Sequence, residues 1–351
     1  MKRLALISSV IIACATTWPV RASTTPTHSV RLILLGTLGG PSADKFRSEP
    51  ANLIIVDGVP YLIDAGDGVA RQLAAVGYRP EQIRTIFITH HHIDHDAGLE
   101  PLLSLSWFDT ALSRHGPLPP VQIYGPPSTR YLVNAALNYL SVSERIFRAG
   151  ISSMPPSNGM FEAHDISHAG PVFADANVRV FAALNTHFHA KSTSGNSAEA
   201  DDKSFAYRFD TANGSIVFTG DTGPSDAVAK LAQGADVLVS EIYAPPAPAS
   251  VQGAEKETPE YRKIREQLAR HMDTEHLTPQ ELGKLATQAG VKVVVLTHFV
   301  PGDDIRDMTQ FTRGVQSNFS GVVIPGQDLM EYDLTRSPGG GKSDQERVNL
   351  P

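Results

Sequence analysis

Four potential metal ligands are concentrated within six positions of the chain, in the pattern H-x-H-x-D-H: His90, His92, Asp94 and His95. Imidazole nitrogens bind zinc, and a neighbouring carboxylate suits zinc, iron or manganese. The pattern follows the apolar run Thr85–Ile88, which predicts a strand, and side chains two positions apart on a strand point to the same side. His90 and His92 therefore face one ion, while Asp94 and His95 on the following turn can serve a second. A solvated histidine tract is the alternative, but it gives no reason for the strand-then-turn context, so we predict that this chain binds metal.

Three further candidate ligands occur later in the chain: His187, Asp221 and His298. Each lies where a predicted strand meets a loop, a place where catalytic groups commonly collect. Taken singly, His187 or His298 is equally well an ordinary buried histidine, and Asp221 a turn residue. In this order behind the histidine-rich motif, a shared metal site is the better explanation. His189 points to the same side of an extended chain as His187 and competes with it for one ligand position.

Runs of apolar residues predict the elements that must position these side chains. Strands are predicted at Val30–Leu35, Leu53–Val56, Tyr61–Ile63, Thr85–Ile88, Val121–Tyr124, Val178–Leu184, Ser204–Phe209, Ser215–Thr219, Val237–Ser240 and Val291–Leu296. Helical spacing is found at Val69–Val76, Leu99–Trp107, Thr129–Leu140, Ala227–Ala232 and Gln280–Ala289. From residue 141 to 175 the pattern weakens, which predicts loops.

Strands in runs, with each half ending in helices, predict an α/β fold: a four-layer αββα sandwich with two sheets back to back. We expect one domain over residues 23–336. The Gly- and charge-rich residues 337–351 are expected to form a disordered tail.

The N-terminus has the features of a secretory signal peptide. Lys2 and Arg3 precede an apolar stretch that is too short to span a bilayer as a mature helix, and Ala22 ends a small-x-small cleavage pattern. We therefore predict a signal peptide over residues 1–22 and a periplasmic or secreted protein.

Cys14 offers an alternative to cleavage after Ala22. With the residues before it, Cys14 resembles a bacterial lipoprotein box, and lipidation there would tether the mature protein to a membrane. It is the single cysteine of the chain, so no disulfide can form, and histidine and carboxylate must do all the metal chemistry. No segment after the signal peptide is long enough to cross a membrane.

The charge of the chain argues against a large nucleic-acid partner. The formal net charge is −7, and removal of residues 1–22 takes away Lys2, Arg3 and Arg21 and brings it to −10. Proteins that grip a polynucleotide through its phosphates usually carry a basic patch or stripe. The densest basic stretch, Tyr261–Arg265, lies among acidic residues and is typical of a solvated helix face. We therefore expect a small substrate and no nucleic acid.

The ordered set of ligands resembles that of the metallo-β-lactamase-fold hydrolases, and the resemblance spans most of residues 30–335. Within that fold the chain is more similar to the branch of ribonuclease Z and arylsulfatase-like enzymes. The motifs that carry this closer resemblance are Leu35-Gly36-Thr37 with Gly39-Gly40-Pro41, Tyr61–Gly68, Ser204–Phe209 and Thr219–Gly223. The resemblance makes Asp221 a bridging ligand; phosphodiesterase-like members carry Asp there, whereas β-lactamases proper carry Cys or Ser.

The resemblance implies a centre of two zinc ions, with manganese or iron as the alternative metals. One ion would be held by His90, His92 and His187 and the other by Asp94, His95 and His298, with Asp221 bridging both. Ions about 3.5–4 Å apart can stabilise both the attacking and the leaving oxygen. Asp64 and Asp67 are expected to orient metal-binding histidines through their free ring N–H groups.

The resemblance also implies catalytic residues. Asp94 would help to orient the nucleophile, and Glu241 with His276 resembles a pair in which a glutamate orients a proton-donating histidine. His276 precedes His298 by 22 residues, the spacing expected from ribonuclease Z. A leaving alkoxide or phenolate needs a proton, which such a histidine can supply. The alternative is that His276 caps the next helix and Glu241 is a surface acid; His271 is the other candidate donor.

We therefore expect an exported dinuclear zinc hydrolase that cleaves a small anionic ester, of the arylsulfatase or phosphodiesterase type, by attack of a metal-bound hydroxide. The alternatives are a ribonuclease Z-like endoribonuclease, a β-lactam or lactone hydrolase, and a non-catalytic periplasmic metal-binding protein. Export argues against transfer-RNA processing, which takes place in the cytoplasm, and no insertion resembling the tRNA-gripping arm of ribonuclease Z is evident. Members of this branch often dimerise, so a homodimer is the oligomer to test for.

Overall fold

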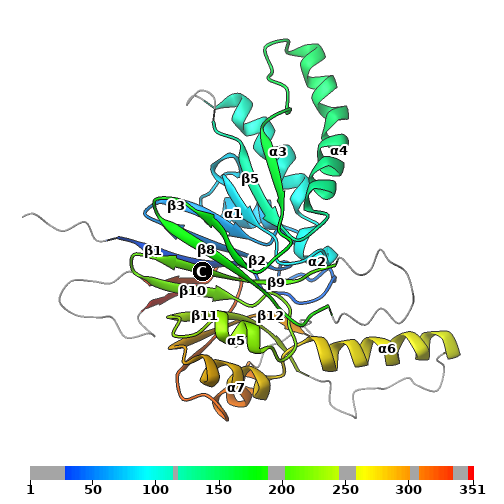
Figure 1. Cartoon of the computed structure of the whole chain (residues 1–351). Coiled ribbons are helices and arrows are strands. Elements are labelled where there is room, and N and C mark those ends of the chain that lie inside the picture. The colour runs from blue at the N-terminus through cyan, green and yellow to red at the C-terminus, as the bar shows by residue number, and fades with distance from the viewer. Residues whose placement is uncertain (1–27, 114–117, 189–201, 245–257, 301–307, 335–346) are drawn as a thin grey trace, which may run out of the picture.

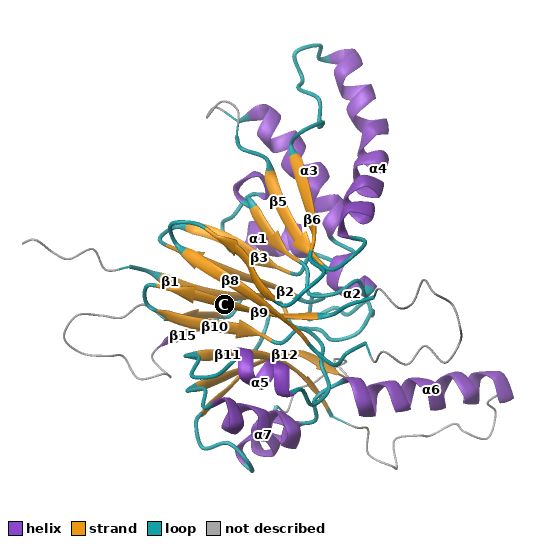
Figure 2. Cartoon of the chain, viewed as in Figure 1, coloured by secondary structure: helices purple, strands orange, loops and turns teal. Residues whose placement is uncertain are grey.

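Two sheets lie face to face, and helices cover their outer faces (Figures 1 and 2). The computed structural model describes residues 28–113, 118–188, 202–244, 258–300, 308–334 and 347–351. The signal peptide expected over residues 1–22 lies outside these ranges. Among the described helices, none combines the length and the apolar character needed to cross a bilayer.

The first sheet contains eight strands, in this order across it: β15 (Val348–Asn349), β14 (Glu331–Asp333), β1 (Val30–Gly36), β2 (Ala51–Val56), β3 (Val59–Ile63), β4 (Thr85–Phe87), β5 (Val121–Gly125) and β6 (Phe161–Asp165). Strands β3 to β6 pair in parallel. The hairpin between β2 and β3 turns at Asp57-Gly58 as predicted, and both residues have the positive φ angles, 49° and 85°, that a tight hairpin turn needs.

The second sheet contains seven strands, in this order: β13 (Val322–Pro325), β12 (Val293–Val300), β11 (Val237–Tyr243), β10 (Gly214–Phe218), β9 (Phe205–Thr211), β8 (Val178–Leu184) and β7 (Gly170–Ala174). Strands β10 to β13 pair in parallel. Parallel pairing in both sheets brings the carboxyl ends of several strands to one edge of the sandwich, where loops can carry a shared site.

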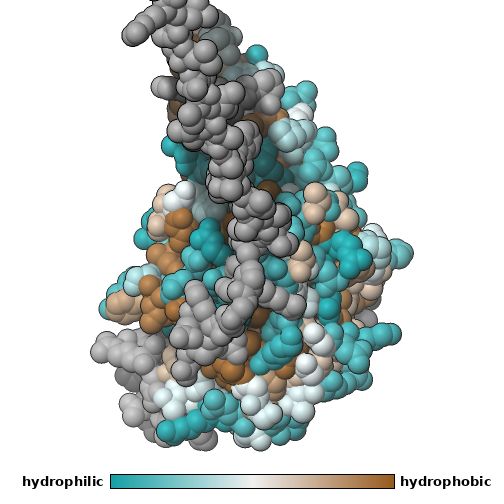
Figure 3. All heavy atoms as spheres, turned by 90° about the vertical axis from the view of Figure 1, so that its left-hand side faces the viewer, coloured by the Kyte–Doolittle hydropathy of each residue, from teal (hydrophilic) through white to brown (hydrophobic). Residues whose placement is uncertain are grey.

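The helices fall into two groups and one outlier. On the side of the first sheet lie α1 (Val69–Ala75), the 3₁₀ turn η1 (Pro80–Gln82), α2 (Ile93–Asp96), α3 (Leu99–Leu112) and α4 (Thr129–Gly150). On the side of the second sheet lie α5 (Asp226–Leu231), α7 (Pro279–Ala289) and α8 (Thr309–Gln316). Helix α6 (Pro259–Glu275) buries none of its residues and extends away from the body (Figure 1). Figure 3 shows the face of the molecule that lies opposite α6. On the described residues of this face, hydrophilic and hydrophobic side chains are interspersed.

Strand β1 illustrates why four layers form. Leu32 and Leu34 are buried in the core between the two sheets, whereas Ile33 and Leu35 are buried against the helices of the first sheet. Side chains alternate along a strand, so a strand that is apolar at four consecutive positions is buried on both faces. The outer face of the second sheet packs in the same way against α5, α7 and α8. The predicted α/β four-layer sandwich is confirmed.

Two regions differ from the prediction. Residues 141–175, predicted as loops, contain the second half of α4 together with β6 and β7. Helix α4 is almost entirely exposed beyond Leu140, and β6 and β7 lie at sheet edges, so neither region has the regular apolar pattern of a buried element. Of the predicted disordered tail, residues 337–346 lie outside the described residues, whereas Val348 and Asn349 are ordered and pair with β14. A two-residue strand is too short to produce a period in the sequence.

Candidate metal centre

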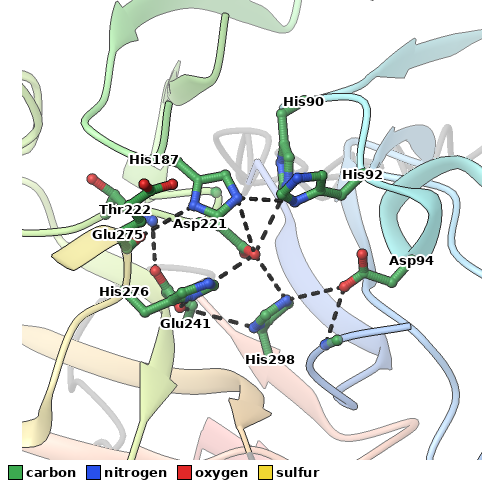
Figure 4. A network of polar contacts seen from close by, with 12 residues as sticks. His90, His92, Asp94, His187, Asp221, Thr222, Glu241, Glu275, His276 and His298 are labelled. Carbon is green, nitrogen blue, oxygen red and sulfur yellow. Dashed lines mark hydrogen bonds and ion pairs between the residues drawn. The ribbon is translucent and has the colours of Figure 1, made fainter. Parts of the chain in front are cut away.

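The H-x-H-x-D-H motif spans the loop after β4 and the short helix α2, at the edge where the second sheet brings its own ligands. His187 follows β8, Asp221 follows β10, and His298 lies near the end of β12. Their side chains converge with those of the motif around the carboxylate of Asp221 (Figure 4). The structure thus brings together all seven residues that were expected to bind metal. His189 lies outside the described residues.

One half of the centre consists of His90, His92 and His187, and we call it the histidine half. His187 Nε2 lies 3.0 Å from His92 Nδ1, and Asp221 Oδ2 lies 3.9 Å from the Nε2 atoms of both His90 and His187. The possible ligand atoms of these four residues all lie within 4.8 Å of one another. Burial lowers the pKa of each of the three histidines, so their rings are neutral and can bind a cation without first losing a proton.

The other half consists of Asp94, His95 and His298, and we call it the carboxylate half. His298 Nε2 lies 3.1 Å from Asp221 Oδ2 and 3.3 Å from Asp94 Oδ2, and His95 Nε2 lies 3.3 Å from Asp221 Oδ1. Burial lowers the pKa of His298, but the Asp221 carboxylate outweighs burial and raises this pKa to about 10. Burial also lowers the pKa of His95, but the neighbouring carboxylates, Asp221 first, outweigh burial and raise this pKa well above its usual value. Burial raises the pKa of Asp94, but His95 and His298 together outweigh burial and bring this pKa down to about 2.

Buried atoms without a hydrogen bond at the centre of the site indicate what these residues hold, although His95 Nε2 and Asp221 Oδ1 face each other at 3.3 Å as an ion pair. Four buried atoms have no hydrogen-bond partner within the described part of the chain: His90 Nε2, His95 Nε2, His298 Nδ1 and Asp221 Oδ1. An unpaired buried polar atom is costly, and native structures contain few of them. Two nitrogens and one carboxylate oxygen that point inward, His90 Nε2, His95 Nε2 and Asp221 Oδ1, have the chemistry of metal ligands.

The protein holds the other ring nitrogen, Nδ1, of three histidines of the site. His95 Nδ1 lies 3.0 Å from Asp64 Oδ2, His90 Nδ1 lies 3.1 Å from the hydroxyl of Thr89, and His187 Nδ1 lies 3.1 Å from the carbonyl oxygen of Glu275. A ring whose Nδ1 is fixed in this way presents Nε2 to a metal ion. The residues therefore fit two divalent cations that share Asp221.

The backbone around the site is held in unusual conformations. Asp64 and His298 have φ angles of 60° and 44°, in the left-handed region that residues other than glycine rarely adopt and that is common at functional sites. Gly39 passes so close that a Cβ atom there would lie 2.7 Å from His298 Nδ1. The next residue, Gly40, donates its N–H to Asp94 Oδ2 at 3.1 Å. The glycine-rich turn after β1 therefore supports the carboxylate half.

Glu241 and His276 form a buried pair beside the metal ligands. His276 Nδ1 lies 2.5 Å from Glu241 Oε2 and 4.0 Å from Asp221 Oδ2. Burial lowers the pKa of His276, but Glu241 outweighs burial and raises it. Glu241 is 2% exposed and therefore no surface acid, and Thr278 is the residue that caps α7. Both structural alternatives for this pair are thus wrong.

Some residues near the motifs differ from the expectations. Asp67 is exposed, so the expectation that it orients a metal ligand is wrong, and its N–H donates to Glu49 Oε2 at 2.9 Å. Glu49 is buried near Asp94, and burial raises its pKa. The sequence around Glu49 contains no motif that would have singled it out. His271, the other candidate donor, has its ring centroid 5.4 Å from that of His276 and pairs with Glu275 at 2.8 Å.

A four-layer sandwich with two histidine–aspartate ligand sets at one edge defines a class of metal-dependent hydrolases. The family described as the beta-lactamase superfamily domain matches residues 60–299, and the chain belongs to this superfamily of metallo-β-lactamase-fold hydrolases, in the ribonuclease Z branch. The chain is 30% identical over 308 residues to the ribonuclease Z of Mycobacterium bovis. This match covers 87% of this chain and 98% of the relative. The ribonuclease Z of Mycobacterium avium is 30% identical over 302 residues, covering 86% and 96%.

Solved structures share the fold. The metallo-beta-lactamase fold protein YhfI from Bacillus subtilis superposes with a TM-score of 0.60 at 18% identity, over 87% of this chain and 99% of that chain. The short form of human tRNase Z superposes with a TM-score of 0.58 at 22% identity, over 87% and 100%. At this level of identity the structures establish the fold, and the chemistry must be argued from the site.

Proposed function

We propose that this protein is a phosphodiesterase that works with two divalent cations, zinc by preference. The observation that carries the proposal is the position of Asp221, whose carboxylate faces the histidine half and the carboxylate half at 3.1 to 3.9 Å, beside the buried His276–Glu241 pair. When bound, two such cations supply Lewis acidity to a phosphoryl oxygen and lower the pKa of water.

The protein side chains divide the remaining work. Asp94, with a pKa of about 2, is a carboxylate at neutral pH and can accept a hydrogen bond from an attacking water, which orients that water. His276 carries a proton because Glu241 raises its pKa, and its Nδ1–H is donated to Glu241. The ring N–H at Nε2 is then the proton that reaches the leaving oxygen.

The second candidate is a ribonuclease Z-like endoribonuclease. The mycobacterial relatives carry that name, and their similarity extends over most of the chain. This favours RNA as a substrate and weighs against the expectation, drawn from net charge, that nucleic acid is not a partner. Arylsulfate and β-lactam hydrolysis rest on the sequence resemblance alone and rank below the two phosphodiester reactions.

The proposal is tested by a substrate panel on the purified, metal-loaded protein: bis-p-nitrophenyl phosphate, p-nitrophenyl sulfate, nitrocefin and a precursor tRNA with a 3′ trailer. We expect turnover of the phosphodiester, lost in Asp221→Ala and kept in Asp67→Ala, a matched control at an exposed aspartate. Dominant sulfate or nitrocefin turnover would contradict the proposal. Metal binding without turnover of any substrate would favour the metal-binding protein.

Export is a separate proposal that rests on residues 1–22. It is tested by fractionating cells that express the full chain and determining the N-terminus of the product. We expect a periplasmic or secreted product that begins at Ser23; a lipid-modified Cys14 would support the membrane-tethered alternative. An uncleaved cytoplasmic product would contradict export and strengthen the tRNA-processing candidate.

A further inference from the structure

A cleft of about 190 Å³ opens beside the metal centre. Asp94, His276 and His298 border it on the side of the centre. Five apolar residues form another part of its wall: Pro41, Ile93, Leu268, Met272 and Val300. The remaining lining residues are Gly40, His92, Asp221 and His271. Within the described residues, the lining includes neither Lys nor Arg.

Two of these apolar side chains are exposed to an unusual degree for residues beside a buried polar site. Ile93 is 63% exposed and stands between the metal ligands His92 and Asp94 in the chain, and Leu268 is 57% exposed on α6. Single exposed apolar side chains are ordinary, but several that meet in one cleft mark a surface that binds an apolar group. Binding pockets commonly combine apolar walls with a few polar groups that fix orientation, as here.

The position of helix α6 indicates which part of the substrate lies against this apolar wall. Leu268 and Met272 are four residues apart on α6 and so lie on the same face of the helix. His276 is four residues further on, at the C-terminal cap of α6, and lines the same cleft. A leaving oxygen that accepts the proton of His276 therefore has its substituent against α6.

The structure assigns this cleft to the leaving group of the substrate: we propose that it binds an aryl or branched alkyl group between Leu268 and Met272 on one wall and Ile93 on the other. The proposal rests on the proposed function and narrows it to phosphodiesters with an apolar leaving group. A sugar–phosphate chain gains little from this apolar wall, because the described lining has no Lys or Arg to pair with its further phosphates.

The first test measures binding and does not depend on turnover. Phenylphosphonate and methylphosphonate carry the same anionic head and differ in the apolar group alone. We expect the metal-loaded wild-type protein to bind phenylphosphonate about tenfold more tightly in isothermal titration calorimetry, the lower end of what one apolar group gains in a pocket. Leu268→Asn should remove most of this preference, and Leu268→Asn/Met272→Asn all of it.

Ile264→Asn is the matched control. Ile264 lies one turn before Leu268 on the same helix, is 61% exposed, and does not line the cleft. It should keep the wild-type preference for phenylphosphonate. Equal preferences in Leu268→Asn and Ile264→Asn, with equal metal content, would overturn the proposal.

The second test separates the failure of this proposal from the failure of the proposed function. With bis-p-nitrophenyl phosphate, Leu268→Asn should raise KM about tenfold, with little change for uridylyl-uridine, an RNA dinucleotide. If the wild-type protein hydrolyses both substrates and Leu268→Asn affects them equally, the leaving-group site is wrong and the phosphodiesterase stands. If neither substrate is hydrolysed but the phosphonate preference holds, the phosphodiesterase is wrong and the apolar site stands.

Discussion

The two halves of the metal centre differ in the charge that surrounds their histidines. In the histidine half, His90, His92 and His187 have lowered pKa values because they are buried. In the carboxylate half, His95 and His298 are also buried but have raised pKa values because the carboxylates of Asp221 and Asp94 outweigh burial. The same side chain is therefore neutral in one half and charged in the other.

This difference has consequences for how the centre takes up metal. A neutral imidazole binds a cation directly, whereas an imidazolium must first lose its proton. We therefore expect the histidine half to bind the first cation at neutral pH and to retain it at lower pH. The carboxylate half should bind the second cation with release of protons.

The largest effect is expected from Asp221→Ala, because Asp221 belongs to both halves. Loss of the shared ligand should lower kcat/KM on the order of 10³-fold, the size seen when a main electrostatic group of an active site is removed. Metal analysis should find fewer than two cations per chain. Retention of both cations and of full activity would mean that the two halves are independent sites.

His276→Ala should leave both halves intact and still impair the reaction. We expect kcat to fall about 10²-fold or more, the usual contribution of a positioned general acid, with metal content unchanged. The loss should be larger for a poor leaving group than for p-nitrophenolate, which needs no proton to leave. Glu241→Gln should have a smaller effect and shift the pH–rate profile, because Glu241 acts by holding the proton on His276. A loss that does not depend on the leaving group would contradict proton donation.

Asp64→Asn should weaken the carboxylate half more than the histidine half. Asp64 Oδ2 holds Nδ1 of His95 directly, so its loss should lower the affinity of the carboxylate half about 10- to 100-fold. The histidine half should lose less, because Asp64 reaches His90 only through the hydroxyl of Thr89, and Asp67→Asn in the same loop should change neither half. Competition with a chelator measures both affinities, and an equal fall in both would contradict the division into two halves.

The smallest effect is a pH dependence of the second binding step. Since the pKa of His298 in the metal-free protein is raised to about 10 and that of His95 is also raised, both rings are protonated at neutral pH. Binding of the second cation should therefore release protons, and its affinity should rise with pH across the neutral range. Calorimetry in buffers of different ionisation enthalpy counts the released protons. More protons released with the first cation than with the second would reverse the assignment.

The cluster of candidate metal ligands could be predicted from the sequence because a local rule places its members. Each follows or ends an apolar strand, and the spacing of His90 and His92 is the period of a strand. The four layers were predictable for the same reason, since strands such as β1 carry apolar residues on both faces.

Residues that act through tertiary position were not predictable in this way. Leu268 and Met272 recur with Ile264 at helical spacing on α6, but this spacing does not show which of them borders the cleft. Glu49 reaches the loop of Asp67 only because β2 and β3 pair, and no local motif surrounds it. Asp67 was assigned a role by its motif, yet the chain turns it outward.

The most direct test of a shared dinuclear centre is a metal titration of the metal-free protein in which phosphodiester turnover is followed against equivalents of zinc. We expect little activity up to one equivalent, when the histidine half fills, and a rise that saturates at two. Activity that is complete at one equivalent would contradict the central claim that the two halves work together through Asp221.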